Sequence, residues 1–175
     1  MRDLIIIGGG ITGAAAFRAA ARAGLSVFLL DRGLAGGATT AVTSGLFHGG
    51  LRYLAHDVAT SYSMCREIAA LLAEKPDLLT RQMFLWPVYR HHKLGFGLVG
   101  SMMEYYDRFA GLRSSPGHFR LSAEETLGRV PALEGAGLDG SFAFDEWRVD
   151  VPRLIRSLLD EGRAAGGEVL EGRKV

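Results

Sequence analysis

The stretch Gly8-Gly9-Gly10-Ile11-Thr12-Gly13 decides the fold, and it matches the pattern GxGxxG. It follows a short apolar run at residues 4–7 and opens an alanine- and arginine-rich segment, residues 12–23, of high helix propensity. A second apolar run at residues 26–30 ends on Asp31, 18 residues after Gly13. A glycine loop between a strand and a helix, with an acidic residue after the next strand, indicates a dinucleotide-binding βαβ unit.

Each position of this loop has a physical role in holding a pyrophosphate. Gly8 allows a tight turn, Gly10 lets the backbone approach the anion, and Gly13 lets the helix and strand pack closely. The start of the helix, at Ile11 and Thr12, offers unpaired N–H groups to the anion. The loop therefore predicts a site for the phosphates of a dinucleotide.

The kind of dinucleotide is less directly encoded, because FAD, NAD and NADP enzymes share this fingerprint. We expect Asp31 to accept hydrogen bonds from the adenosine ribose, and its charge disfavours a 2′-phosphate, although Arg32 beside it weakens that argument. A second cluster of glycine, threonine and serine at residues 33–50 includes apolar residues that a solvated linker would not need. A demanding segment at this place suits the large, permanently held ring system of a flavin, so FAD is the favoured cofactor.

Composition excludes several other classes of protein. The chain has 175 residues, of which 48% are hydrophobic, and a net charge of +1, so no broad basic face indicates nucleic-acid binding. Its one cysteine, Cys65, cannot form an internal disulfide or a multi-thiolate metal site. No apolar run reaches the roughly 18 residues of a membrane-spanning helix. We expect no metal site, since the pair His91-His92 lacks further nearby ligands.

The remaining pattern predicts further helices and strands. We expect helices over residues 62–74, 94–110, 122–130 and 150–165, of which the third opens with a capping box at Ser122 and the fourth is capped by Asp150. We expect strands over 83–90, 141–144 and 168–175, and Pro87 places the first of these strands at an edge or a bulge. The fold class is α/β, a doubly wound Rossmann-like FAD-binding domain with part of an inserted substrate domain, and its first strand is expected to be buried on both faces. We divide the chain into an FAD-binding core and flavin loop (1–80), a partial substrate region (81–140) and a return to the FAD-binding domain (141–175). Because the chain stops after a strand pattern, we expect it to be the N-terminal portion of a longer protein.

One family combines these motifs. His48-Gly49-Gly50-Leu51-Arg52-Tyr53-Leu54, with residues 3–31 and Gly37-Ala38-Thr39-Thr40, resembles the N-terminal part of FAD-dependent glycerol-3-phosphate dehydrogenases, flavoproteins of the D-amino-acid oxidase type. Weaker similarity continues in order through residues 105–111, 121–125, 130–133, 149–150, 153–154 and 167–170. The stretch 48–54 is the most specific part, because the glycine fingerprint occurs in many flavoproteins.

The resemblance implies a set of site residues. Besides the fingerprint, it implies a flavin-lining loop and a group at the isoalloxazine and substrate pocket: Thr39, Thr40, Ser44 and Leu46 for the loop, and His48, Arg52 and Tyr53 for the pocket. Oxidation of a secondary alcohol needs a proton acceptor and a cation near the developing alkoxide, for which His48 and Arg52 are candidates. The alternatives are a His48 tied to the backbone or linked covalently to the flavin, a structural salt bridge for Arg52, and a core position for Tyr53.

The resemblance also implies an activity: oxidation of glycerol 3-phosphate, a phosphorylated polyol, to dihydroxyacetone phosphate. The implied electron acceptor is a quinone, and the implied location is cytoplasmic, peripheral on the inner face of the plasma membrane. From the residues themselves, we interpret the methionines and tyrosines at 102–106 as core at helical spacing, with a membrane interface at residues 94–103 as the alternative. Val42 stands where the family usually has an arginine, which puts the phosphorylated substrate in doubt. The alternatives are an amine or hydroxy-acid oxidase of the same superfamily, and a catalytically silent FAD-binding fragment.

Overall fold

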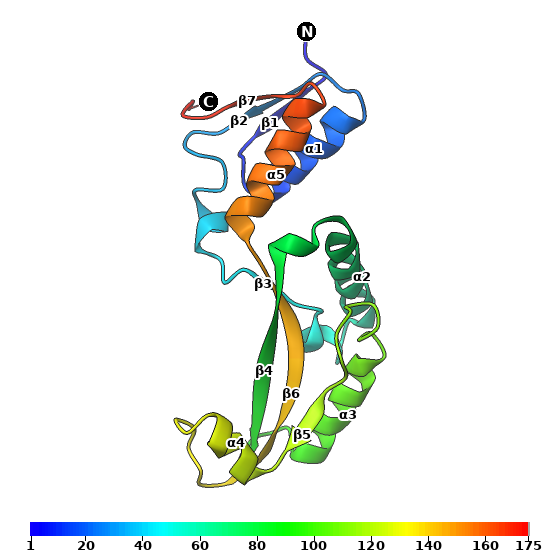
Figure 1. The fold of residues 1–175 in the computed structure, drawn as a ribbon, viewed down its shortest axis with the longest axis vertical. Coiled ribbons are helices and arrows are strands. Elements are labelled where there is room, and N and C mark those ends of the chain that lie inside the picture. The colour runs from blue at the N-terminus through cyan, green and yellow to red at the C-terminus, as the bar shows by residue number, and fades with distance from the viewer. Residues whose placement is uncertain (175) are drawn as a thin grey trace. The chain divides into compact units, whose positions relative to one another are not determined.

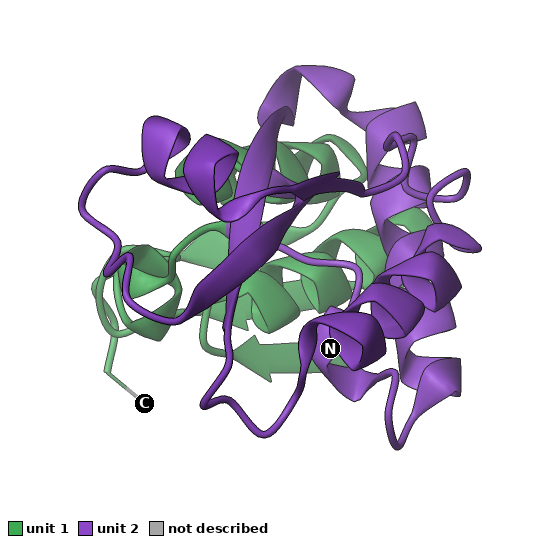
Figure 2. Cartoon of the chain, turned by 90° about the horizontal axis from the view of Figure 1, so that it is seen from below, with its two compact units in different colours: residues 1–45, 149–175 green, residues 46–148 purple. Residues whose placement is uncertain are grey.

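The computed structural model describes residues 1–174, which fall into two compact units. Unit 1 comprises residues 1–45 and 149–175, and unit 2 comprises residues 46–148 (Figure 2). These limits differ from the three-part division drawn from the sequence, which placed boundaries at 80 and 140. The difference arises because β3 (Leu46–Phe47) pairs with β6 (Leu138–Val149), so the loop after the first βαβ unit already enters the second sheet. The assignment of functional domains to the three segments stays a prediction.

Unit 1 contains a three-stranded parallel sheet in the order β1-β2-β7. β1 (Leu4–Ile7) pairs with β2 (Val27–Leu30) in a register that places Leu4 opposite Val27, and β7 (Glu168–Leu170) adds to the other edge of β2. The sequence-predicted βαβ unit and the α/β class with a parallel sheet are confirmed. β7 is shorter than expected, and the expected strand end at residue 175 lies outside the described residues.

Two helices lie side by side against one face of this sheet (Figure 1), and they pack directly on each other. α1 (Ile11–Arg22) contributes Phe17, whose side chain is fully buried, and α5 (Val151–Ala164) contributes Ile155 and Leu158. α5 begins as its sequence predicts, because the Asp150 side chain accepts a hydrogen bond from the Arg153 N–H at 3.1 Å.

The expectation that the first strand is buried on both faces is wrong for the described chain. Ile5 and Ile7 are 58% and 70% exposed, whereas Val27 and Leu29 of the neighbouring strand are fully buried. The physical reason is that α1 and α5 contact each other and so cover the same face of the sheet. The apolar run at residues 4–7 therefore predicted a strand correctly, but it did not predict whether helices cover one face of that strand or both.

Unit 2 is built on a second sheet in the order β3-β6-β4, with β5 (Phe119–Leu121) also paired to β6. β4 (Leu79–Tyr89) carries Pro87 and ends this order, as the missing N–H of proline requires. β6 is much longer than the expected strand at 141–144. Both long strands run beside one another in Figure 1.

Three helices complete unit 2: α2 (Val58–Glu74), α3 (Phe96–Asp107) and α4 (Ala123–Arg129). α2 begins four residues earlier than predicted, because Asp57 caps it by accepting the Thr60 N–H at 3.0 Å. The core between helices and sheet is formed by fully buried residues of α2, α3, β4 and β6: Cys65, Val88, Val99, Met103, Tyr106 and Phe142. None of the helices in the described part of the chain combines the length and the apolar character that crossing a membrane would need.

Candidate functional site

The glycine loop of unit 1 has the geometry that its sequence predicts. Gly8 has a φ of +101°, in the region that favours glycine, and its N–H donates to the carbonyl of Leu30 at 2.8 Å. A β-carbon on Gly13 would collide with the carbonyl oxygen of Gly8, and one on Gly9 would lie 2.7 Å from the Ala35 β-carbon. The N-cap of α1 is Gly10, which has no side chain to cap the helix. The loop therefore leaves open a cradle beside the positive end of α1, as a pyrophosphate requires.

Asp31 braces this loop. Its carboxylate accepts the N–H groups of Gly9 at 2.7 Å and of Gly33 at 2.8 Å. The bond from Gly33, followed by that from Gly9, lowers the pKa of Asp31, and the charge of Arg32 lowers it further. Each carboxylate oxygen keeps a second lone pair, so the expected contact with a ribose hydroxyl stays a prediction that the geometry permits.

The second glycine- and threonine-rich segment also bonds to the loop through Thr40. Thr39 and Thr40 lie in the 3-10 helix η1 (Thr39–Val42), and Thr40 accepts the N–H of Ile11 through its hydroxyl at 3.3 Å. The structure thus brings Thr40 to the start of α1, where it gives a partner to the Ile11 N–H that was expected to be unpaired. Val42 is 83% exposed. The flavin contacts expected of Thr39, Thr40 and Ser44 stay predictions.

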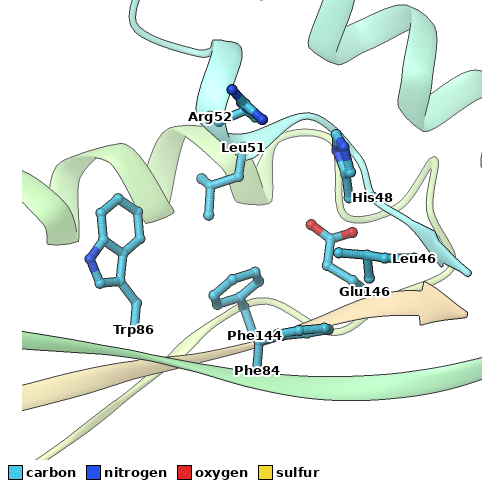
Figure 3. A pocket seen from close by; sticks show the side chains of 8 residues that line it. All are labelled: Leu46, His48, Leu51, Arg52, Phe84, Trp86, Phe144 and Glu146. Atoms are coloured by element: carbon cyan, nitrogen blue, oxygen red, sulfur yellow. The ribbon is translucent and has the colours of Figure 1, made fainter. Parts of the chain in front are cut away.

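Unit 2 contains a separate cavity of about 320 Å³ (Figure 3). Its walls are mostly apolar, and three ionisable side chains, His48, Arg52 and Glu146, stand among them. The complete lining is Leu46, His48, Leu51, Arg52, Phe84, Trp86, Phe144 and Glu146. A small apolar pocket with a few convergent polar groups has the character of a site for a small molecule.

His48 begins a tight turn between β3 and the 3-10 helix η2 (Leu51–Tyr53). Gly50 has a φ of +84°, and this conformation lets its N–H donate back to Nδ1 of His48 at 3.2 Å. Because Nδ1 is the acceptor of this bond, the neutral imidazole carries its hydrogen on Nε2. In this geometry His48 offers the pocket a hydrogen-bond donor.

Two other residues expected at the pocket lie in η2. Arg52 lines the cavity, and its guanidinium lies over the ring of Tyr53 at 5.4 Å from the centroid. Tyr53 is not among the lining residues, but its ring lies 6.4 Å from that of His48, centroid to centroid. The structure therefore brings His48, Arg52 and Leu46 together around the cavity. Tyr53 lies outside the lining and contacts Arg52.

Sequence reasoning missed Glu146. This residue is only 3% exposed. Its Oε2 accepts the Gly49 N–H at 2.9 Å, and its Oε1 accepts the Tyr106 hydroxyl at 2.7 Å. Burial raises the pKa of this carboxyl above its ordinary value, although the bonds from Tyr106 and Gly49 and the charges of Arg113 and His48 lower it. The neighbouring Asp145 instead pairs with Arg81 at 3.6 Å. The available signal was the period-2 alternation, which puts Phe144 and Glu146 on one face of a strand.

Arg113 is a second buried charge beside the same turn. Its guanidinium stacks on the face of Tyr106 at 4.0 Å from the ring centroid, and it donates to the carbonyl of Asp145 at 2.8 Å. Within the described residues its Nε is buried without a hydrogen-bond partner. Burial also raises the pKa of the nearby Cys65 thiol to about 11. The turn at Gly49 therefore rests on a cluster of buried polar groups and not on apolar packing alone.

A parallel βαβ unit with a glycine loop at the start of its helix and a braced acidic residue after its second strand defines a dinucleotide-binding domain. A family model described as FAD dependent oxidoreductase matches residues 3–175. The chain belongs to this family of FAD-dependent oxidoreductases, which confirms the expected class of cofactor.

Individual proteins refine this assignment. The chain is 32% identical over 173 residues to an aerobic glycerol-3-phosphate dehydrogenase of Staphylococcus saprophyticus, covering 98% of this chain and 31% of that protein. The fold is similar to that of the glycerol-3-phosphate dehydrogenase of Bacillus halodurans complexed with FAD, with a TM-score of 0.70 and 23% identity over 100% of this chain and 27% of that one. It is also similar to the fold of glycine oxidase from Geobacillus kaustophilus, with a TM-score of 0.64, 20% identity, and 99% and 47% coverage. The chain spans about a third of the length of the curated relatives it matches.

Proposed function

We propose that the protein is an FAD-dependent dehydrogenase that oxidises glycerol 3-phosphate to dihydroxyacetone phosphate. The observation that carries this proposal is the cavity of unit 2, where His48 and Arg52, from the most family-specific stretch of the sequence, stand together in an apolar setting. The similarity to glycerol-3-phosphate dehydrogenases over nearly the whole chain supports it.

The loop of unit 1 is suited to the ADP part of FAD. The N–H groups that follow Ile11 at the start of α1 would hold the pyrophosphate, in the cradle left by the three glycines of the fingerprint. Asp31 would accept the ribose hydroxyls. A β-carbon on Gly10 would lie 3.1 Å from the Thr40 hydroxyl and would narrow this cradle. When bound, FAD supplies the acceptor for the hydride that leaves the substrate carbon.

The pocket residues would act on the substrate oxygen and its phosphate. The Nε2–H of His48 would donate a hydrogen bond to the hydroxyl oxygen of the substrate and so orient that oxygen. In this tautomer His48 is not the acceptor of the hydroxyl proton, which differs from the role expected from the sequence. Arg52 would bind the phosphate through its planar, permanently charged guanidinium. The apolar walls at Phe84, Trp86 and Phe144 would lower the local dielectric constant beside a bound substrate and so strengthen its polar contacts.

The electron acceptor and the membrane contact also belong to this proposal. A quinone-type acceptor would be met at the cytoplasmic face of the plasma membrane. Leu94 lies just before α3 and Leu98 lies in its first turn, and both apolar side chains are exposed. They support a peripheral contact with a lipid surface. Binding of the chain to lipid vesicles would test that contact, and a Leu98→Asp substitution should weaken this binding.

A second candidate is oxidation of a small amino acid. Among the described lining residues Arg52 is the one arginine, and a guanidinium fork binds a carboxylate as well as a phosphate. The sequence has Val42 where the glycerol-3-phosphate dehydrogenases that it resembles usually have an arginine, so the chain lacks that cation. The similarity in fold to glycine oxidase is compatible with this candidate.

One experiment tests the cofactor and separates the substrates. The chain is reconstituted with FAD, and absorbance between 350 and 500 nm is followed anaerobically after addition of glycerol 3-phosphate or of glycine. Bleaching by glycerol 3-phosphate alone supports the dehydrogenase, whereas bleaching by glycine alone supports the amino-acid oxidase. Gly10→Val should abolish FAD binding, whereas Gly97→Ala, where a β-carbon would meet nothing within 4 Å, should retain it. Stoichiometric FAD in the Gly10→Val variant would contradict the cofactor site.

A further inference from the structure

The turn that carries His48 is held by contacts to its backbone. The carbonyl of Gly50 accepts the Ser61 hydroxyl of α2 at 2.8 Å, and the carbonyl of Gly49 accepts the Cys65 thiol at 3.4 Å. These two bonds tie the turn to the helix. On the opposite side, the Gly49 N–H donates to Glu146, which is 97 residues away in β6. Glu146 thus adds a side-chain link between the turn and β6, beside the backbone pairing of β3 with β6 that ends at Phe47.

The turn has no room to move at this point. A β-carbon on Gly49 would overlap the Tyr106 hydroxyl and would lie 2.7 Å from Cδ of Arg113 and 2.9 Å from Sγ of Cys65. Close packing of this kind fixes where Gly49 lies, but it does not fix the direction of its N–H. That direction is set by the carboxylate oxygen of Glu146 at 2.9 Å. The Gly49 N–H belongs to the peptide between His48 and Gly49. The next peptide, between Gly49 and Gly50, carries the N–H that donates to Nδ1 of His48.

We propose that Glu146 is the positioning residue for His48: by accepting the Gly49 N–H, it orients the turn so that the Gly50 N–H stays on Nδ1 and the neutral imidazole keeps its hydrogen on Nε2. The use of that hydrogen on a substrate oxygen rests on the proposed function, whereas the tautomer itself does not. Tyr106 supports the arrangement, since its hydroxyl holds the other oxygen of the carboxylate at 2.7 Å.

The chemistry of the cluster explains why a carboxylate serves here. A buried N–H and a buried hydroxyl both need acceptors, and one carboxylate group supplies two oxygens in a fixed plane. The guanidinium of Arg113 stacks on the ring of Tyr106, and its positive charge offsets the buried negative charge of Glu146. A side chain with one acceptor oxygen satisfies the turn, and a side chain with none leaves the Gly49 N–H unpaired.

Two substitutions separate positioning from charge. Glu146→Gln keeps an amide oxygen for the Gly49 N–H and removes the negative charge, while Glu146→Leu removes every acceptor at similar volume. Tyr106→Phe releases only the far oxygen of the carboxylate and is the variant to use if Glu146→Leu does not fold. Ser141→Ala is the matched control, because Ser141 is a buried polar residue of the same strand whose hydroxyl bonds to Thr126 at 2.8 Å.

The first readout needs neither FAD nor substrate. The 175-residue chain labelled with ¹⁵N-histidine has five imidazoles, and the signals of His48 are those that a His48→Gln variant loses. For His48 we expect a single Nε2–H tautomer. Glu146→Gln and Ser141→Ala should keep that tautomer. Glu146→Leu should give a mixture of both tautomers, and Tyr106→Phe should shift the population in the same direction by less. A single unchanged tautomer in Glu146→Leu, or in Tyr106→Phe where the former does not fold, would overturn the proposal.

The second readout is the rate of flavin reduction by glycerol 3-phosphate in the reconstituted chain. We expect Glu146→Leu to lower the rate roughly 100-fold with unchanged FAD binding, and Glu146→Gln to stay within about threefold of the wild-type rate. If Glu146→Gln is as slow as Glu146→Leu while keeping the Nε2–H tautomer, the carboxylate acts by its charge or as a proton acceptor, and the proposal is wrong. If the wild-type chain is not reduced at all, the proposed function fails, and the tautomer measurement still decides the role of Glu146.

Discussion

The ring of Phe17 in α1 lies directly against Gly162 in α5, so closely that a β-carbon on Gly162 would overlap the ring. A β-carbon on Gly167, just beyond the helix, would also lie 2.6 Å from the same ring. This contact joins a residue of the glycine-fingerprint helix to a helix 145 positions later, and both cover one face of the parallel sheet. The absence of side chains at these two glycines allows the two helices to approach.

Gly162→Ala should therefore destabilise the protein, although alanine is the better helix former. The propensity gain is about 1 kcal/mol, whereas overpacking against a buried ring costs about 1–3 kcal/mol, so we expect a net loss of about 1 kcal/mol. Urea unfolding followed by circular dichroism would measure it. Gly128→Ala is the control, because this exposed glycine of α4 has nothing within 4 Å of a β-carbon and should gain stability. Equal effects of the two substitutions would contradict the packing argument.

Ionised Asp31 should stabilise the folded protein, and this contribution should depend on pH. Hydrogen bonds from the N–H groups of Gly33 and Gly9 lower its pKa in the folded state below the ordinary value of 3.8. A depressed pKa stabilises the fold fully above the unfolded-state value, and this contribution is lost as the pH falls through the folded-state value. The stability difference between wild type and Asp31→Asn should thus be constant above pH 5 and shrink toward pH 3. Urea midpoints of both proteins across this range test it, and a difference independent of pH would show that the carboxylate charge is not involved.

Cys65 should report the opening of unit 2. Burial raises the pKa of its thiol to about 11, and alkylation requires the thiolate. At pH 8 we expect iodoacetamide to modify the native protein roughly 100-fold more slowly than the urea-unfolded chain. Mass spectrometry counts one adduct, because Cys65 is the one cysteine of the sequence. Equal rates in the two states would mean that the core around the Gly49 turn is open to solvent.

Ser122→Ala should remove one cap of α4. The Ser122 hydroxyl accepts the Glu125 N–H at 3.1 Å, while the Glu125 carboxylate accepts the Ser122 N–H at 2.7 Å, which is the capping box that the sequence predicts. We expect a loss of about 1 kcal/mol in the free energy of unfolding. Ser101→Ala, at an exposed position of α3, should change it by less than about 0.5 kcal/mol. A loss of the same size in both variants would point to a general effect of serine removal.

The local features of this fold were predictable because their causes are local. The glycine loop, the cap at Asp150, the capping box at Ser122 and the edge position of the strand containing Pro87 each depend on residues within a few positions of one another. The start of α2 was predicted too late, because Asp57 as its N-cap was overlooked. These elements needed no knowledge of distant contacts.

The sequence by itself determined the family and the dinucleotide loop, since the glycines that permit close approach lie in one continuous segment. It also predicted, without a test of that prediction, that the chemistry takes place at residues 48–54. Only the tertiary structure decided which groups surround His48. Glu146, Tyr106 and Arg113 reach its turn from β6, from α3 and from the segment after α3, positions that lie far from residue 48 in the chain. It also decided that one face of β1 is exposed, because the layers around a strand depend on helices that lie far from it in the chain.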